Sequence, residues 1–451
     1  MFKPKIIVLL VCFIVLIILY GCGSIIQNSN STTPTVTSYN TYFGDIHAHT
    51  AYSNDAWLIQ KLIVGMAPVV ASGAILNAID NGLDFVAITD HAEDLSLNPL
   101  YGDEWINIQN ECNAANGADI VAFIGFEFTK TSGTLDANGD QIDITGGGHK
   151  CVIFKNATIP AAPFPSSGTN LPTDLWSYLA SYECITIPHH PARGDAPEGR
   201  GEYDMSTDWD YMPSNVALMP LVEIFSVHGS SDYLGCDDEV PGFRDDRSVE
   251  SALQKWFTTG SAAYKLGILC STDNHISNPG VCVTESVDAI ISAEGNYSGG
   301  LVAALATAKT RDSIFDALVA KRVYGTSGPK IGLTFTATVE GDSATYIMGE
   351  TIRGASGKVV RLHISASAGT TGATIQNIVL TQGISPEVGS DGITKTTINA
   401  SSADLAFTIT ENTYFRITAY QSATQRWDPI TSAWVDTNER AWSSPIWVEV
   451  N

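Results

Sequence analysis

The segment YFGDIHAHT, residues 42–50, joins an apolar run of strand length to two histidines. The same unit recurs as far as about residue 271: an apolar run, a motif rich in His, Asp or Glu, then a loop or helical stretch. Seven runs can be counted: YFGDI (42–46), LDFVAIT (83–89), DIVAFIGF (119–126), HKCVIF (149–154), ECITIP (183–188), LMPLVEIF (218–225) and KLGILCS (265–271). Continuous apolar runs are typical of strands buried on both faces, in a parallel barrel or a doubly wound sheet.

The remaining segments indicate helices and a change of character near residue 330. Residues 71–81 and 248–257 have helical spacing, and a further helical segment is expected around 301–321. From about residue 332 the runs alternate, as in LTFTATV, VVRLHISAS and YFRITAY, which predicts a small antiparallel β-sandwich. We therefore expect one domain over 41–330 and a second over 331–451.

The positions of the histidines predict a metal centre. Eight of the nine precede residue 280, and most follow or end a predicted strand, which in parallel barrels is the face that carries chemistry. His47 and His49 would point to the same side of a strand and reach one cation, with Asp55 arriving from the following loop. Further candidate ligands occur at the later strand ends: His91, Glu127, His149, His189, His190, Asp273 and His275. Asp45 and Asp90 are expected to orient imidazoles rather than to bind metal.

These motifs resemble those of the polymerase and histidinol phosphatase (PHP) superfamily of metal-dependent phosphoesterases. The matching segments are DIHAHT with SNDA, TDH, the lone Glu127, His149, PHHP and STDNH, in that order. The sequence is also similar to an exported branch with enzymes resembling carbaryl hydrolase, through RVYGTSGPKIGL and the ending SSPIWVEV. The resemblance implies an α/β fold, a distorted seven-stranded (β/α) barrel of PHP type followed by the small all-β domain.

The resemblance also implies two or three divalent ions. The ligands of the first would be His47, His49, Glu127 and Asp273, and Glu127 would bridge to a second ion held by His149 and either His189 or His190. The third group would be Asp55, His91 and His275. Such ions activate water against an ester, and these ligands suit Zn, Mn or Fe equally.

Several other residues are candidates for work on a substrate. Glu223 and His228 follow the sixth run and could contact substrate or transfer protons, or play a structural part. Arg193, Arg200 and Lys150 lie near the motifs and could bind an anionic substrate, although loop arginines are often only solvated. His363 is interpreted as structural. The function classes that remain are a phosphoester hydrolase, a carboxyl or carbamate ester hydrolase, and a metal-stabilised surface module that binds glycan or cell wall without turnover.

The N-terminus predicts export to the bacterial cell envelope. Lys3 and Lys5 precede an apolar run over 6–20, as in a secretory signal, and residues 19–22 resemble the lipobox of bacterial lipoproteins. We expect a signal peptide over 1–22 with Cys22 as the lipidated residue, and a polar tether over 23–40. The alternative is an uncleaved transmembrane anchor.

Charge and cysteine content limit the partners. The formal net charge of −24 makes nucleic acid an unlikely partner, so a small-molecule ester and the membrane are the expected ones. Beyond Cys12 and Cys22, six cysteines lack the paired spacing of a zinc knuckle, and we do not expect them to bind metal. In an oxidising compartment they could form disulfides.

Overall fold

All seven apolar runs form strands, and the computed structural model describes residues 38–97, 101–130, 147–166, 170–194, 205–280, 299–428, 433–437 and 439–451. The strands up to residue 326 are β1 (Asn40–Asp45), β2 (Phe85–Ile88), β3 (Val121–Lys130), β4 (Gly148–Phe154), β5 (Cys184–Pro188), β6 (Leu221–Ser226), β7 (Gly229–Ser230), β8 (Gly267–Cys270), β9 (Leu301–Ala306) and β10 (Val323–Thr326). The later strands are β11 (Gly332–Val339), β12 (Thr345–Ile347), β13 (Thr351–Ile352), β14 (Val359–Ser367), β15 (Ile375–Gly383), β16 (Ile393–Ile398), β17 (Ser402–Thr408), β18 (Thr413–Gln421), β19 (Thr424–Asp428), β20 (Ala433–Thr437), β21 (Arg440–Ser443) and β22 (Ile446–Val448).

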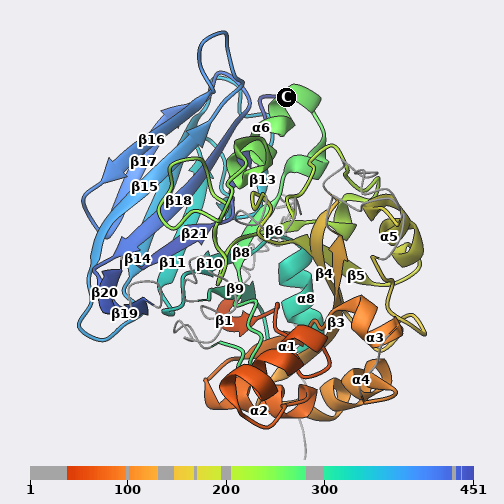
Figure 1. Cartoon of the computed structure of the whole chain (residues 1–451). Coiled ribbons are helices and arrows are strands. Elements are labelled where there is room, and N and C mark those ends of the chain that lie inside the picture. Colours follow the sequence, from red (N-terminus) through yellow and green to blue (C-terminus); the bar gives the residue numbers. More distant parts are fainter. Residues whose placement is uncertain are drawn as a thin grey trace, which may run out of the picture. The chain divides into compact units, whose positions relative to one another are not determined.

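The helices between residues 54 and 179 lie beside the strands β1 to β5 (Figure 1). The α-helices are α1 (Asn54–Leu58), α2 (Ala71–Asp80), α3 (Ala92–Leu97), α4 (Glu104–Ala115), α5 (Pro172–Leu179), α6 (Val249–Thr259) and α8 (Arg311–Val319). A π-helix, η1 (Ile59–Val64), continues α1, and short 3-10 turns are η2 (Val216–Leu218), η3 (Asp245–Arg247) and η4 (Ala262–Tyr264). The helices expected over 71–81 and 248–257 are confirmed as α2 and α6. The helix expected over 301–321 is wrong in its first part, which is strand β9.

The expected distorted seven-stranded (β/α) barrel followed by a small all-β domain is wrong. The described chain contains large mixed sheets, and its strands do not close into a barrel. In the main sheet β1, β2 and β3 form a parallel run, and β13 pairs parallel with β22. Strand β4 is antiparallel to both β3 and β5, and β9 is antiparallel to β1. The parallel pair β6 and β8 belongs to a separate sheet. Continuous apolar runs report burial of both faces, but they do not report the direction of the neighbouring strand.

Strand β3 shows why its run is apolar throughout. Ala122, Ile124, Phe126 and Phe128 face one hydrophobic core, shared with α2, α4 and α5. Val121 and Phe123 face another, which the strands β1 to β6 and β8 to β10 share with α8. Glu127 lies on this second face, because side chains alternate along a strand. The carboxylate therefore points to the same side as the core that the strands enclose.

The strands after residue 331 share a third core, but they are divided between sheets of their own and the main sheet. The sheet β12-β11-β14-β17 packs apolar side chains such as Phe335 and Leu362 against Ile417 of β18. Strand β18 pairs with β21, which pairs with β10, so the main sheet runs from β13 to β5 through both parts of the chain. Residues Tyr39–Asn451 form one compact unit, and the division at residue 330 stays a prediction.

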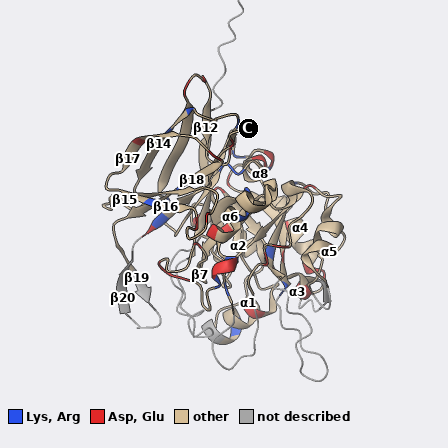
Figure 2. Cartoon of the chain, turned by 90° about the horizontal axis from the view of Figure 1, so that it is seen from above, with Lys and Arg blue, Asp and Glu red and all other residues tan. Residues whose placement is uncertain are grey.

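The basic residues and the helices of the described chain bear on the expected partners and on export. Lys and Arg residues lie at scattered positions along the described ribbon (Figure 2). Among the described residues, no helix has the length and apolar character needed to cross a membrane. The expected signal peptide with Cys22, and the tether up to residue 37, lie outside the described residues.

Candidate metal centre

The candidate ligands come together because they follow or extend neighbouring strands. His47 and His49 follow β1, His91 follows β2, Glu127 and His149 lie within β3 and β4, His189 follows β5, and Asp273 follows β8. Two further bridges hold these ends together, between Ala48 and Asn274 and between His91 and Glu127. The site therefore forms where β1, β2, β3, β4, β5 and β8 converge.

The first ligand group consists of His47, His49, Glu127 and Asp273, all buried. Glu127 Oε2 lies 3.4 Å from His47 Nε2 and 3.1 Å from His49 Nε2. Asp273 Oδ1 lies 3.2 Å and 3.3 Å from the same two nitrogens, which are 3.4 Å apart. A tetrahedral ion with bonds of about 2.0–2.1 Å has ligand-to-ligand edges of about 3.3–3.4 Å. The spacing of these four atoms fits one such ion.

The second ligand group uses the other oxygen of Glu127. Its Oε1 atom lies 3.1 Å from His149 Nδ1 and 3.3 Å from His189 Nε2. Despite this distance, His189 Nε2 is buried and makes no well-oriented hydrogen bond to any described residue. A nitrogen that faces a carboxylate without hydrogen bonding to it fits a cation between the two. Glu127 thus faces two ligand groups with its two oxygens.

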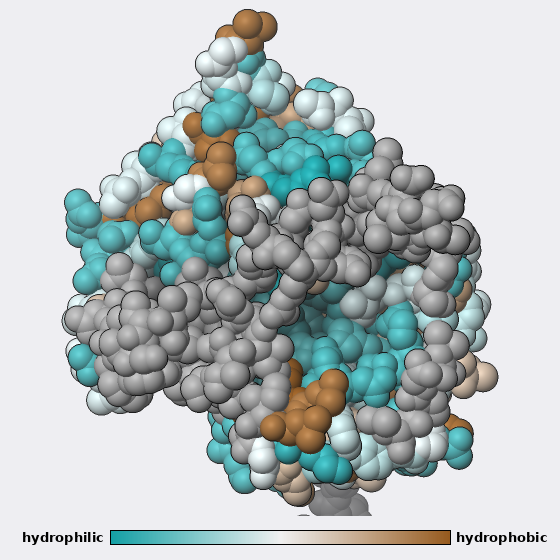
Figure 3. Space-filling view, viewed as in Figure 1, coloured by the Kyte–Doolittle hydropathy of each residue, from teal (hydrophilic) through white to brown (hydrophobic). Residues whose placement is uncertain are grey.

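The third ligand group is nearer to solvent. Asp55 Oδ2 lies 3.1 Å from His91 Nε2 and 3.2 Å from His275 Nε2, and the Asp55 side chain is 47% exposed. His49 lies beside both histidines, with its ring stacked on that of His275 at 4.2 Å. Figure 3 shows a hydrophilic hollow on one face of the molecule, bordered by an apolar patch. Among the described ligand groups, the third therefore contains a carboxylate that solvent can reach, that of Asp55.

The charges of the centre also fit bound cations. Burial would raise the pKa of Glu127, but the positive charge of His91 and contacts with the neighbouring histidines hold this pKa well below its usual range. Burial would likewise lower the pKa of His47, but the Asp273 carboxylate and other neighbours raise it well above the usual value. Protons on buried histidines thus balance the buried carboxylates. A divalent ion among the same atoms would take over this balancing charge.

A second layer of polar side chains fixes the ligands. Ser53 Oγ lies 3.0 Å from His49 Nδ1 and donates to Asp90 Oδ1 at 2.8 Å. Asp45 accepts hydrogen bonds from the backbone and hydroxyl of Thr272, next to the ligand Asp273. These contacts agree with the orienting part expected of Asp45 and Asp90, because neither touches a ligand atom of the three groups directly.

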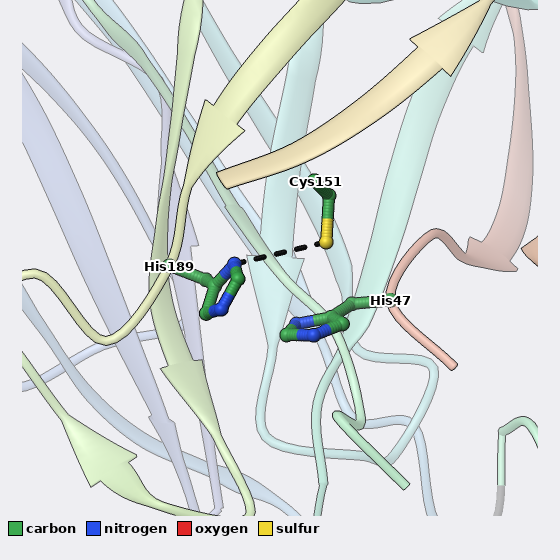
Figure 4. A group of neighbouring side chains, drawn as sticks. All are labelled: His47, Cys151 and His189. Carbon is green, nitrogen blue, oxygen red and sulfur yellow. Dashed lines mark hydrogen bonds between the residues drawn. The ribbon is translucent and has the colours of Figure 1, made fainter. Parts of the chain in front are cut away.

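Sequence reasoning missed three of these positioning residues. Ser53 is one, and Thr129 is another, whose hydroxyl lies 2.8 Å from His91 Nδ1 and donates to Glu127 Oε1 at 3.2 Å. The third is Cys151, whose sulfur lies 3.7 Å from His189 Nδ1 (Figure 4). The signal was available for Thr129 and Cys151, since each stands two residues after a candidate ligand on the same strand face.

The adjacent histidines 189 and 190 occupy different places. His189 reaches Glu127, whereas His190 lies near both the second ligand group and a further set formed with His228 and Asp273. His190 and Asp273 have φ of 31° and 56°, a left-handed conformation that costs energy outside glycine. Such strain is concentrated at functional sites, where the surrounding structure enforces it.

The residues expected to contact substrate or transfer protons lie in two places. Glu223 Oε2 lies 3.2 Å from His47 Nδ1, so Glu223 holds a ligand ring. His228 is 20% exposed, with Nε2 3.0 Å from Asp273 Oδ2. Burial, together with the nearby Arg193 guanidinium, lowers the pKa of His228 to about 4, so its ring is neutral at pH 7. Arg193 is buried beside this ring, and Arg200 lies outside the described residues.

Two other residues lie apart from the centre. Lys150 shares its strand face with the core residue Val152, and its Nζ donates to Gly147 O at 2.5 Å. His363 lies on β14, where it contacts Asp404 at 2.6 Å and Thr338 at 3.2 Å. Neither belongs to a ligand group, so Lys150 does not supply the charge suggested for it.

Comparisons with known proteins match the chain to a family of unknown function. A family model described as "Protein of unknown function (DUF3604)" matches residues 36–100, 95–259 and 247–390. A comparison with curated proteins found no match. A similar solved structure is a two-domain protein containing a predicted PHP-like metal-dependent phosphoesterase from Bacteroides vulgatus. It is 12% identical, the match covers 89% of this chain and 95% of that chain, and the TM-score is 0.37, too low to indicate a shared fold. The resemblance to the carbaryl-hydrolase-like branch stays a prediction.

Proposed function

The chain belongs to the DUF3604 family, and from the geometry of its site we propose that it is a metal-dependent hydrolase. Two or three divalent ions would activate water against a phosphoester or a related ester. The observation that carries the proposal is the position of Glu127. Its Oε2 atom faces His47 and His49, and its Oε1 atom faces His149 and His189. A carboxylate shared in this way brings two cations close together.

The ions and the protein would have separate tasks. Neighbouring divalent ions, when bound, lower the pKa of water toward neutrality and stabilise charge on the attacking and leaving oxygens. Asp273 would hold the first ion through Oδ1 while its Oδ2 contacts His228. Since the His228 ring is neutral and partly exposed, it can accept a proton from a group that reacts beside it. Glu223, on the far side of His47, keeps that ring in place.

A metal-stabilised binding module without turnover is the alternative. A structural metal site needs one ion with a closed set of ligands. Here the candidate ligands form three adjoining groups, and the third contains the half-exposed Asp55, 3.1 Å from His91 and 3.2 Å from His275. An accessible carboxylate in a multinuclear centre favours catalysis over a purely structural part.

The primary experiment combines metal analysis with turnover. Purified protein is loaded with Zn, Mn or Fe, its ion content is measured, and a panel of chromogenic phosphoesters and carboxyl esters is assayed. We expect at least two ions per chain and metal-dependent hydrolysis. Glu127→Gln should lose both, because the amide nitrogen cannot replace a ligand oxygen, whereas Glu340→Gln, an exposed carboxylate, should change neither. One ion or none under metal-replete conditions would reject the multinuclear centre.

Substitution of Arg193 distinguishes between the two proposed substrate classes. It is buried beside His228, close enough to that ring to lower its pKa. If phosphoesters are the substrates, Arg193→Ala should raise KM for phosphoesters more than for neutral esters. Equal effects on both classes would favour a carboxyl or carbamate ester.

We also propose that the protein is exported and tethered to the cell envelope by lipid at Cys22. The support is the sequence alone, through the basic residues, the apolar run and the lipobox-like ending at residue 22. A small-molecule ester is then the proposed partner in that compartment, and nucleic acid is not.

A further inference from the structure

A buried cysteine lies behind the second ligand group. Cys151 on β4 points its sulfur toward the ring of His189, with the ring of His47 beside it (Figure 4). Cys151 Sγ lies 3.7 Å from His189 Nδ1, and the two rings have their centroids 4.1 Å apart. Ligand atoms of all three residues lie within 4.8 Å of one another. The thiol is therefore one member of a cluster with two imidazoles.

The spacing suits a metal ion bound through sulfur. With bonds of about 2.3 Å to sulfur and about 2.0–2.1 Å to nitrogen, a tetrahedral ion separates these two ligand atoms by about 3.5–3.6 Å. The sulfur-to-nitrogen distance of 3.7 Å is close to this value. Little rearrangement is needed to place an ion between them.

The surroundings supply negative charge without exposing the site. His47, Cys151 and His189 are each no more than 2% exposed. Glu223 Oε2 lies against His47 Nδ1, and its Oε1 atom is buried with no hydrogen bond to any residue that the structure describes. The Glu223 carboxylate, in contact with His47, can offset the charge of a cation bound by His47, Cys151 and His189.

We propose that His47, Cys151 and His189 form a further cation site that selects thiophilic ions such as Cd²⁺ or Cu⁺. Thiolate and imidazole ligands favour these ions over Mg²⁺, Ca²⁺ and Mn²⁺. Binding forms a metal–sulfur bond and releases the thiol proton to solvent. The site does not depend on the hydrolytic function, because it needs no substrate and no shared carboxylate.

The site overlaps with the first two ligand groups. His189 faces Cys151 with Nδ1 and Glu127 with Nε2, and His47 faces Asp273 with Nε2. An ion held by the sulfur would draw these rings away from the positions that the other ions need. Thiophilic ions should therefore inhibit the protein if the proposed hydrolysis is correct.

The test is a titration of the full-length, metal-depleted protein with CdCl₂. The readout is the ultraviolet charge-transfer absorption of a cadmium–thiolate bond, which does not require activity. We expect the wild type to gain the absorption of one thiolate that Cys151→Ser lacks. Cys184→Ser is the matched control, because Cys184 is also buried but its sulfur lies near a backbone carbonyl, that of Leu179. The control should keep the wild-type absorption.

Equal absorption in the wild type and Cys151→Ser would overturn the proposal. A second measurement does not require a variant: cadmium-113 NMR of the wild type should show a resonance in the range of mixed sulfur and nitrogen ligation. Resonances only in the range of oxygen and nitrogen ligation would also overturn it. Neither result bears on the hydrolase, which is tested by turnover with Zn, Mn or Fe.

Discussion

Replacing Arg416 by Met should destabilise the fold far more than an ordinary surface substitution. Arg416 lies on β18 and is 1% exposed, and its guanidinium pairs with Asp232, which follows β7. Its NH1 atom lies 3.4 Å from Asp232 Oδ2, and its NH2 atom lies 3.8 Å from Glu250 Oε2. The pair joins a late strand to the segment that begins just after His228.

The magnitude follows from burial. Removing one partner of a buried ion pair leaves the other charge without compensation and costs about 3–5 kcal/mol. An exposed pair contributes only about 0–1 kcal/mol. Arg353, which pairs with Glu449 and is 71% exposed, provides the matched comparison. We therefore expect Arg416→Met to lower the free energy of unfolding by about 3–5 kcal/mol and Arg353→Met by about 1 kcal/mol or less.

Equilibrium unfolding in urea measures both values. Tryptophan fluorescence and circular dichroism must give coincident transitions before a free energy is assigned. The double variant Arg416→Met with Asp232→Leu should recover much of the loss, because no lone buried charge remains. If Arg416→Met and Arg353→Met cost the same, or if the double variant is no better than the single one, the reasoning from burial is wrong.

Three other predictions test the centre, the strand beside it and the N-terminus. Gln60→Leu should lower the affinity of the third ligand group for its ion by about 10- to 100-fold and leave the other groups unchanged. The reason is that the Gln60 amide donates to Ser277 Oγ at 2.9 Å, two residues after His275. Elemental analysis showing full occupancy would contradict this. Burial lowers the pKa of Lys150 from 10.5 to about 7, so between these values the unfolded chain binds more protons and stability rises with pH. Lys150→Met should abolish that rise, by up to a few kcal/mol, in urea unfolding at pH 6 and pH 10, and an unchanged rise would assign it to other groups. Cys22→Ala should release the protein from membranes or block its processing, and a mature protein that still begins with Met1 would reject the lipid anchor.

The sequence predicted the strands better than the sheet. Each apolar run, such as the one before Glu127, became a strand because both its faces are buried. The strand direction could not be predicted, since β4 is as fully buried as β2 but pairs antiparallel on both sides. The run over 301–306 is rich in alanine and suggests a helix, yet β9 forms because β1 and β10 pair with it. Tertiary pairing outweighed local propensity there.

The placement of two candidate ligands was predictable because their spacing is short-range. His47 and His49 stand two residues apart, which places both on one side of an extended chain. By contrast, the contact between Cys151 and His189 depends on the pairing of β4 with β5, so it could not be derived from either segment alone. The choice between His189 and His190 likewise needed the bend after β5, where His190 takes a positive φ.

The continuity of the main sheet sets an order for folding. The strand before His47 is hydrogen-bonded to β9, which leads through β10 to β21 and β18, within the last forty or so residues. Contacts between such distant parts of a chain form slowly, because a long loop must close first. The early strands cannot complete their sheet until the C-terminal strands have been synthesised. A nascent chain that has not yet reached β9 would leave β1, the strand before His47, as an unpaired edge, so metal binding would come late in folding rather than at its start.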